Sequence, residues 1–511
     1  MFKQLLEKNS QNQKNLQAID NDISSEHIPK ILNNFFGVSS EKKNLENLYK
    51  DLEIFQDRDG CPKNSVFNKI NKCQTHVGSF YLKELISKYN VSRGTLENQQ
   101  YLIQELINKE EDYQQIDNTM TSISKSENDV LWLWKEHTKE TNSYLDMVYF
   151  KGFILDSLNK NELFLKFYNL FQIVVSPAMN IITPIVAVII PYLFVRCTTT
   201  MPIDFKEYFQ ALNISDSLGP DGKSLKYAQY ISVFIWLLYY GHSIYASVKV
   251  SMNTNKIINI IHSRVNNIAN FIKKSFEINE KYCKYFGCEL LSKVCDSLWC
   301  KTFISCPSLL SDKGKILVTY RYLTSNKDIL KPIINFLGKV DSYLSIIKLL
   351  KGNTNSKNKF CFPKYHSNNK PFYQVEGLWH PYLDSEKTIS NDFNLGEAYK
   401  NNAIITGPNA GGKSTFIKSV VISILLSQTI GICPAKRVSL TLFSKLETYL
   451  NIPDLKGKES LFEAEVNRAL SYVRTLEETP EDKYSLIVMD EIFNSTNPEE
   501  GISGAYSICQ K

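Results

Sequence analysis

Residues 403–415 read AIITGPNAGGKST, and the helix-forming run FIKSVVISILL follows them directly. The apolar run before the glycines is typical of a short strand, so the pattern predicts a strand, a glycine-rich loop and a helix in succession. Four residues separate Gly407 from Gly412, and Lys413 and Ser414 come next. Loops with this spacing turn backbone N–H groups towards phosphates, while the lysine adds a positive charge and the serine hydroxyl offers a ligand to Mg²⁺. The sequence therefore predicts a phosphate-binding loop at the start of a helix.

A second segment, YSLIVMDEIFNST at 484–496, supplies the acidic residues that such a site needs. Its apolar run predicts a strand that ends at Asp490, where the carboxylate could hold Mg²⁺ through water. Glu491 follows and is placed to orient or deprotonate an attacking water. The segment lies about 80 residues after the loop in the same α/β-type region. Together the two segments predict binding of ATP with Mg²⁺, with hydrolysis as the reaction.

The rest of the chain divides into segments that differ in composition and hydrophobic periodicity. At 511 residues it is too long for one ordinary core, and 43% hydrophobic with 22% charged residues is typical of a globular protein. Helical periodicity dominates residues 45–165 and 251–350, after a polar Asn/Lys-rich segment at 1–44. A polar linker at 351–371 precedes alternating strands and helices at 372–511, which predict an α/β domain with a mainly parallel sheet. The expected fold is multidomain: a mainly α core or lever region, then an α/β nucleotide-binding domain.

Two apolar runs at 167–195 and 227–248 carry no Asp, Glu, Lys or Arg. Each is long enough to cross a bilayer as a helix, so residues 166–250 predict an apolar hairpin that inserts in a membrane. The other interpretation is a pair of helices buried inside a large soluble core. Basic residues outside both runs favour the cytosolic side for the flanking regions, including the nucleotide-binding domain.

The remaining composition is less informative. The formal net charge of +6 is small for this length and is compatible with nucleic acid without arguing for it. Eleven cysteines include no C-x-x-C pair, and the spacing of the cluster at 283–306 fits no zinc ribbon or finger. Reduced thiols in an intracellular compartment are therefore preferred over a metal site. The N-terminus has no apolar region typical of a cleavable signal.

Several motifs resemble the MutS family of DNA mismatch-repair ATPases. They are TGPNAGGKST (406–415), GICPA (431–435), SLFEAEV (460–466), DEIFNST (490–496) and VEGLWHPYL (375–383). The helical segments at 52–106 and 337–346 are similar to the family's core. The resemblance implies a P-loop ATPase domain of the ABC type that follows a helical core.

The resemblance also assigns residues and partners. Phosphate and Mg²⁺ contacts would come from Gly407, Pro408, Asn409, Ala410, Gly411, Gly412, Lys413, Ser414 and Thr415. Asp490 would serve the metal, and Glu491 and Lys413 would be catalytic. Ser460 would reach the γ-phosphate of a partner subunit, which implies a homodimer or heterodimer with composite ATP sites. Ser460 could equally cap the helix that follows, and the two roles can coexist.

The sequence departs from the family pattern in several places. The adenine-stacking aromatic falls at Thr388, with Ile389 or Tyr382 as substitutes, and no histidine follows His380. Few residues precede the core, so we expect the N-terminal mismatch-reading domains to be absent. The chain stops about 20 residues beyond Glu491, so we expect the ATPase domain to be incomplete at the C-terminus. The expected function couples MgATP binding and hydrolysis to double-stranded DNA in mismatch repair or related DNA transactions. The alternative is a membrane-anchored, ATP-dependent switch or scaffold of MutS descent that does not read mismatches.

Overall fold

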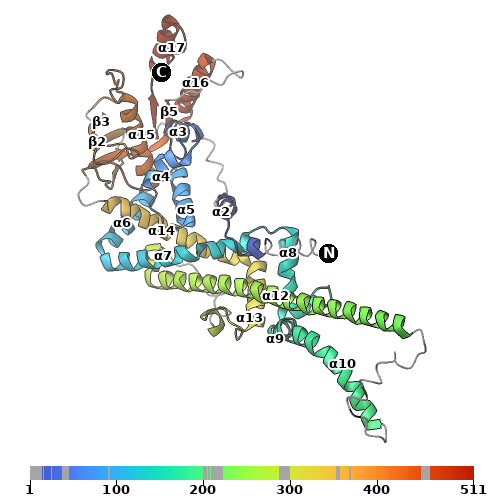
Figure 1. The fold of residues 1–511 in the computed structure, drawn as a ribbon. Coiled ribbons are helices and arrows are strands. Elements are labelled where there is room, and N and C mark those ends of the chain that lie inside the picture. The colour runs from blue at the N-terminus through green and yellow to red at the C-terminus, as the bar shows by residue number, and fades with distance from the viewer. Residues whose placement is uncertain are drawn as a thin grey trace. The chain divides into compact units, whose positions relative to one another are not determined.

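The computed structural model shows a largely helical protein with a small amount of sheet (Figure 1). It describes residues 14, 16–24, 26–36, 45–89, 92–198, 204, 208, 222–286, 298, 300–352, 357–367, 370–396, 399–450, 461–480 and 482–510. The chain divides into two compact units. Unit 1 contains residues 1–23, 128–272 and 292–329, and unit 2 contains residues 24–127, 273–291 and 330–511.

The helical part of unit 2 is built around α5 (His76–Ser87) and α14 (Lys331–Lys351), which pack against each other. Gly78 of α5 lies so close to α14 that an added Cβ would fall 2.2 Å from Asp341 Oδ2. Only glycine permits this approach. The other helices here are α2 (Ile28–Phe36), α3 (Glu46–Asp51), α4 (Val66–Ile70), α6 (Arg93–Asn108) and most of α7 (Glu110–Leu131).

Two buried carboxylates bind the N-terminus of α5. Asp341 Oδ2 accepts hydrogen bonds from Thr75 N at 2.8 Å and Thr75 Oγ1 at 2.7 Å. Glu127 accepts from His76 N at 2.9 Å and Val77 N at 2.7 Å. These bonds satisfy N–H groups that the first turn of a helix leaves without an intrahelical partner. Burial nevertheless raises the pKa of Glu127 to about 7, with a smaller contribution from the nearby Asp341 charge.

The α/β part of unit 2 holds two small sheets. The first has the order β1-β4-β2-β3, and the second pairs β5 with β6. The strands are β1 (Lys364–His366), β2 (Phe372–Leu378), β3 (Asn391–Gly396), β4 (Arg437–Thr441), β5 (Phe443–Tyr449) and β6 (Tyr484–Met489). The helices are α15 (Lys413–Thr429), α16 (Leu461–Glu478) and α17 (Pro498–Gln510).

Two sequence expectations for this region are wrong. The sheet is not mainly parallel, since β1–β4 and β5–β6 pair in parallel but β2 is antiparallel to both β3 and β4. The apolar run at 403–406 forms no strand. Strand propensity becomes a strand only where a neighbouring strand supplies hydrogen bonds, and Ile404 is instead 93% exposed. The predicted strand at 484–489 is confirmed as β6.

Unit 1 is dominated by long helices. α9 (Glu162–Leu170), the π-helical segment η6 (Phe171–Val175) and α10 (Ser176–Thr198) follow one another without a break, and α10 accommodates Pro184 and Pro191. α12 (Gly222–Phe286) contributes residues to both units. α13 (Lys313–Ser325) packs against α9, and α8 (Lys139–Leu145) also belongs to this unit.

The two apolar runs lie against each other inside unit 1. Ser251 Oγ of α12 donates to Ile173 O at 2.6 Å, and Tyr240 OH donates to Ile181 O at 2.9 Å. The two runs are therefore adjacent helices, and the predicted hairpin connection at 199–221 lies largely outside the described residues.

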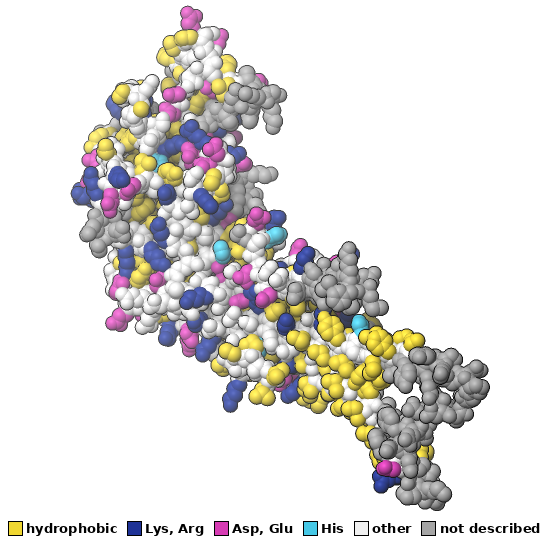
Figure 2. Space-filling model, viewed as in Figure 1, with side chains coloured by type: hydrophobic (Ala, Val, Ile, Leu, Met, Phe, Trp, Pro, Cys, Tyr) yellow, Lys and Arg dark blue, Asp and Glu magenta, His cyan; other side chains and the backbone are white. Residues whose placement is uncertain are grey.

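Their apolar side chains nevertheless face outwards, and Figure 2 shows them gathered over this part of unit 1. Only 6% of the most apolar window of Glu162–Val186 is buried, so the interpretation as wholly buried core helices is wrong. Among the described residues, this is the one helix long and apolar enough to span a membrane, judged by length and composition. A further apolar helix at Ile189–Thr198 is shorter.

The buried Glu127 predicts a pH-dependent stability. Its pKa of about 7 in the folded state lies above its ordinary value of 4.5, so the folded protein binds the proton more tightly. The stabilisation is complete below about pH 4.5 and is lost as the pH rises through about 7, with a slope of at most about 1.4 kcal/mol per pH unit. In Glu127→Gln this contribution to the slope should disappear, as urea unfolding across this pH range would measure.

Glu111→Gln is the matched control, because Glu111 is an exposed residue of the same helix. It should keep the pH slope of the unsubstituted protein. Identical slopes in the unsubstituted protein and both variants would contradict the role of Glu127.

Candidate functional site

The glycine-rich loop at 407–412 connects an exposed segment to α15. Gly411 N donates to Pro408 O at 3.1 Å, which closes a tight turn. Ala410 and Gly412 have φ angles of 60° and 84°, in the left-handed region that favours glycine. A Cβ at Gly411 would fall 2.9 Å from Pro408 O, so the turn itself excludes larger residues at that position. The loop is exposed and ends where the first N–H groups of α15 begin.

Backbone carbonyl groups of the loop hold the Lys413 side chain over it. Its Nζ donates to Gly407 O and Pro408 O, both at 2.9 Å. The ammonium group and the N-terminus of α15 thus place positive charge at the same exposed loop. Both features favour a bound anion, because a helix N-terminus offers N–H donors and a partial positive charge.

The structure brings together Ser414 and Asp490, which lie 76 residues apart in sequence. Ser414 Oγ donates to Asp490 Oδ2 at 2.6 Å. Asp490 directly follows β6, and its N–H donates to Tyr449 O at 2.8 Å, next to the end of β5. A hydroxyl and a carboxylate are oxygen ligands of the kind that Mg²⁺ takes, usually together with water and phosphate oxygens. No group of three or more His, Cys, Asp or Glu side chains suited to a metal occurs among the described residues.

Glu491 follows Asp490 in the chain, and its carboxylate is bound by a residue other than Ser414. Its φ angle of 51° places it in the left-handed region. Asn494 Nδ2 donates to Glu491 Oε2 at 2.9 Å, which holds the exposed carboxylate within the DEIFNST segment. The structure therefore places Lys413, Ser414, Asp490 and Glu491 at one exposed end of the α/β region.

Ser460 lies outside the described residues, so its two predicted roles stay predictions. The helix that follows it, α16, is anchored by contacts that the sequence analysis did not identify. Arg468 forms an ion pair with Asp51 at 2.6 Å, and the Asp51 side chain is 3% exposed. Thr448 Oγ1 donates to the same carboxylate at 2.8 Å. Ser495 Oγ donates to Glu465 Oε2 at 2.5 Å and joins α16 to the DEIFNST segment.

The three candidates for contact with a nucleotide base have different surroundings. Thr388 Oγ1 donates to Asp384 O at 2.5 Å, and Ile389 is 79% exposed. Tyr382 lines a cavity of about 160 Å³ that also contacts Thr415, just after the loop. Tyr382 is therefore the candidate that the structure brings next to α15.

Lys418, Glu53 and His380 also line this cavity, and the sequence analysis assigned none of them to the site. Lys418 Nζ binds Glu53 at 2.8 Å, which joins α15 to the segment after α3. Burial and, to a smaller extent, the Lys418 charge lower the pKa of His380 to about 4. Its imidazole is therefore neutral at neutral pH. The remaining lining residues are Leu52, Val66 and Leu383.

None of the described cysteines of the cluster at 283–306 forms a disulfide. Cys283, Cys300 and Cys306 are free thiols, and Cys288 and Cys295 lie outside the described residues.

Comparisons with known proteins point to one family. Residues 403–511, which contain the loop and both acidic residues, match the family profile described as MutS domain V. The chain is 37% identical over 145 residues to the MutS protein homolog him-14 of Caenorhabditis elegans, an alignment that covers 28% of this chain and 16% of that protein. It is 33% identical over 179 residues to Endonuclease MutS2 of Lactobacillus helveticus, covering 34% of this chain and 21% of that protein.

A longer alignment extends into the helical region. The DNA mismatch repair protein MSH3 of Vanderwaltozyma polyspora is 24% identical over 338 residues, covering 60% of this chain and 31% of that protein. The matched region therefore spans less than a third of the length of each of these relatives.

Proposed function

This chain is a member of the MutS family, and from that premise we propose that residues 372–511 form a P-loop ATPase domain of the ABC type. The domain binds ATP with Mg²⁺ and hydrolyses the γ-phosphate bond. The contact between Ser414 Oγ and Asp490 Oδ2 carries the proposal, because it joins the loop and the acidic strand end into one site.

Each residue has a distinct part in the proposed reaction. Lys413 exchanges its two backbone carbonyl partners for the β- and γ-phosphates, which the N–H groups of the loop also bind. Ser414 and Asp490 hold Mg²⁺, the latter through water. Glu491 orients the attacking water and takes its proton. Ser460 of each subunit reaches the γ-phosphate of its partner, so that ATP holds a dimer together.

We propose that this cycle is coupled to double-stranded DNA in mismatch repair or a related DNA transaction. The proposal comes from the relative named as a DNA mismatch repair protein. The structure supplies two physical connections for the coupling. Lys418 of α15 binds Glu53, and Arg468 of α16 binds Asp51. A nucleotide-dependent shift of α15 or α16 would therefore displace the segment at 51–53 through these contacts.

Two substitutions separate nucleotide binding from hydrolysis. Lys413→Ala removes a charged donor to the phosphates, so the affinity for MgATP should fall about ten- to hundred-fold. Glu491→Gln keeps the phosphate contacts and should leave that affinity nearly unchanged. It should lower phosphate release about 10²- to 10⁴-fold, since the base is lost. Equilibrium binding of labelled ATP and a phosphate-release assay measure the two effects.

Lys436→Ala and Asp482→Asn are matched controls, because both residues are exposed and belong to the same region as the loop and β6. Both should behave as the unsubstituted chain. Unchanged ATP affinity in Lys413→Ala would refute the phosphate-loop assignment. Normal turnover in Glu491→Gln would refute only the role of that glutamate.

Duplex DNA binding is a separate prediction. A surface that neutralises about four phosphates should lose about ten-fold in affinity each time the salt concentration doubles. Fluorescence anisotropy with a labelled duplex over a salt series measures this slope. Absence of binding at low salt, with ATP binding intact, would favour the scaffold alternative.

A second function is favoured by the exposed hairpin: anchoring in a membrane. Exposed apolar side chains recur along the whole helix from Glu162 to Thr198 and along the first half of α12. An exposed apolar stretch long enough to cross a bilayer indicates a lipid environment. The most exposed members described are Leu163, Phe167, Phe171, Met179, Ile185, Ile190, Phe194, Ile231, Phe234, Ile235, Leu238 and Tyr239. We propose that this hairpin inserts in a bilayer, with the ATPase domain on the cytosolic side.

Carbonate extraction of membranes from cells that express the chain tests the anchor. The unsubstituted protein should stay in the membrane pellet. A double substitution, Ile181→Lys with Ile185→Lys, should release it, because each charge near the bilayer centre costs about 3 kcal/mol. Ile502→Lys with Tyr506→Lys is the matched control. These two exposed residues also lie four positions apart, but on α17. Extraction of the unsubstituted protein would exclude an integral anchor.

A further inference from the structure

Two cysteines that are far apart in sequence lie directly opposite each other in unit 2. Cys361 N donates to Cys433 O, and Cys433 N donates to Cys361 O, both at 2.9 Å. The two residues thus form an isolated antiparallel bridge. Both are free thiols in this structure.

The geometry of such a bridge suits a disulfide. Residues that exchange both backbone hydrogen bonds have Cα atoms about 5.5 Å apart and side chains on the same face. Disulfides join residues whose Cα atoms are about 4.4 to 6.8 Å apart. The two thiols influence each other, since the Cys433 thiol lowers the pKa of Cys361. The backbone pairing therefore holds the two cysteines at a Cα separation that disulfides span.

The two thiols differ in reactivity. Cys361 is only partly buried, and its hydrogen bond with Cys433 lowers its pKa below the ordinary value. Cys433 is fully buried, and burial raises its pKa. A solvent-borne oxidant reaches Cys361 first, and a thiolate is the form that reacts.

We propose that Cys361 and Cys433 are a redox-sensitive pair that hydroperoxides convert to a disulfide. In the first step the Cys361 thiolate attacks one peroxide oxygen and the O–O bond breaks. Cys361 becomes a sulfenic acid, and the leaving oxygen takes a proton to become water. In the second step the Cys433 sulfur attacks the Cys361 sulfur, loses its proton and expels the hydroxyl as a second water. Two thiols are oxidised, and one hydrogen peroxide is reduced to two waters.

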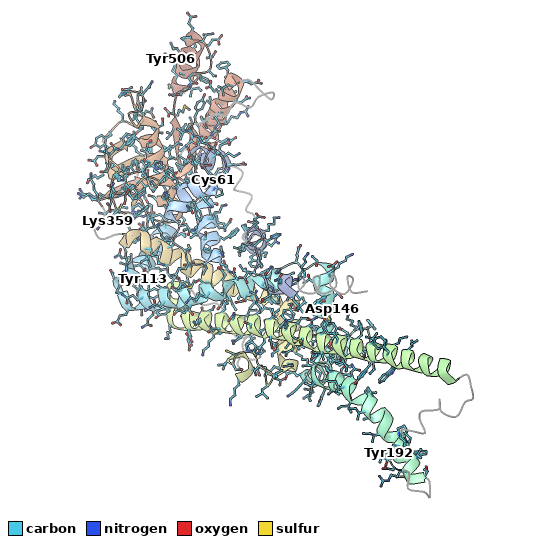
Figure 3. The ribbon with its side chains drawn as sticks, in the orientation of Figure 1. Cys61, Tyr113, Asp146, Tyr192, Lys359 and Tyr506 are labelled. Carbon is cyan, nitrogen blue, oxygen red and sulfur yellow. The ribbon has the colours of Figure 1, made fainter. Side chains whose placement is uncertain are left out.

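The disulfide would fix two segments that meet beyond the C-terminal end of α15, the end opposite the loop at 407–412. Cys433 follows Gly431, which comes directly after the last turn of α15. Cys361 lies in the segment after α14, next to Lys359 (labelled in Figure 3), whose carbonyl accepts a hydrogen bond from Trp379 Nε1 at 3.2 Å. The residues between the two cysteines include the whole loop at 407–412. The disulfide would therefore close a covalent ring of the chain that contains the loop at 407–412 and α15.

Peptide mapping of the native chain tests the proposal. The protein is treated with hydrogen peroxide, its free thiols are alkylated, and it is digested without reductant. The expected product is a Cys361–Cys433 linked peptide, two hydrogens lighter than the separate peptides and absent after treatment with dithiothreitol. Two of the eleven thiols should disappear from a thiol titration. Oxidation should also raise the melting temperature, because a cross-link restricts the unfolded chain.

Variants make the result specific. Cys361→Ser should abolish the linked peptide and the peroxide-induced rise in melting temperature, while its reduced form melts as the unsubstituted protein does. Cys61→Ser, at another partly buried thiol of unit 2, should change neither. Peroxide treatment that modifies Cys361 without linking it to Cys433 would overturn the proposal. Linkage that appears only in unfolded protein, or equally with other cysteines, would also overturn it.

Discussion

The buried cap on α5 is the constraint on which unit 2 depends. Asp341 comes from α14 and Glu127 from α7, so the N-terminus of one short helix joins three segments that are distant in sequence. The two carboxylates bind the backbone N–H groups of Thr75, His76 and Val77, and the Thr75 hydroxyl accepts from Gly78 N at 2.9 Å. α5 in turn packs against α15, the helix that follows the phosphate loop. The position of the loop relative to the helical part of unit 2 thus depends on two buried acids.

Local patterns predicted the local parts of the site. The spacing of Gly407, Gly412 and Lys413 is followed by a helix that begins at Lys413, and the apolar run before Asp490 is a strand. The contact between Ser414 and Asp490 was predictable because both were assigned to one metal. Failures occurred where pairing between distant segments decides the outcome. The run at 403–406 has strand propensity but forms no strand. The direction of β2 relative to its neighbours is set by β3 and β4, which cannot be identified as its partners from the sequence of β2 alone.

The buried ion pair of Asp51 and Arg468 could not be predicted for a related reason. The two residues lie 417 positions apart, and nothing in the local sequence of either distinguishes it from an ordinary surface charge. Burial of such a pair is costly unless further hydrogen bonds complete it. Thr448 provides these bonds, with its hydroxyl on Asp51 and its carbonyl accepting from Arg468 at 2.7 Å. A fully bonded pair of this kind fixes the position of α16 more strictly than apolar packing would, because each partner accepts only one geometry.

The end of β6 places two consecutive acids in different backbone conformations. Asp490 keeps a backbone hydrogen bond to Tyr449 and stays in line with the sheet, so its carboxylate meets Ser414. Glu491 and Phe493 both take positive φ angles, a conformation that costs a non-glycine residue about 1 kcal/mol or more. Phe493 is held there because its ring packs in a buried cluster with Tyr449 and Tyr472. The chain therefore turns sharply after Asp490, and Glu491 does not continue the strand direction that Asp490 keeps.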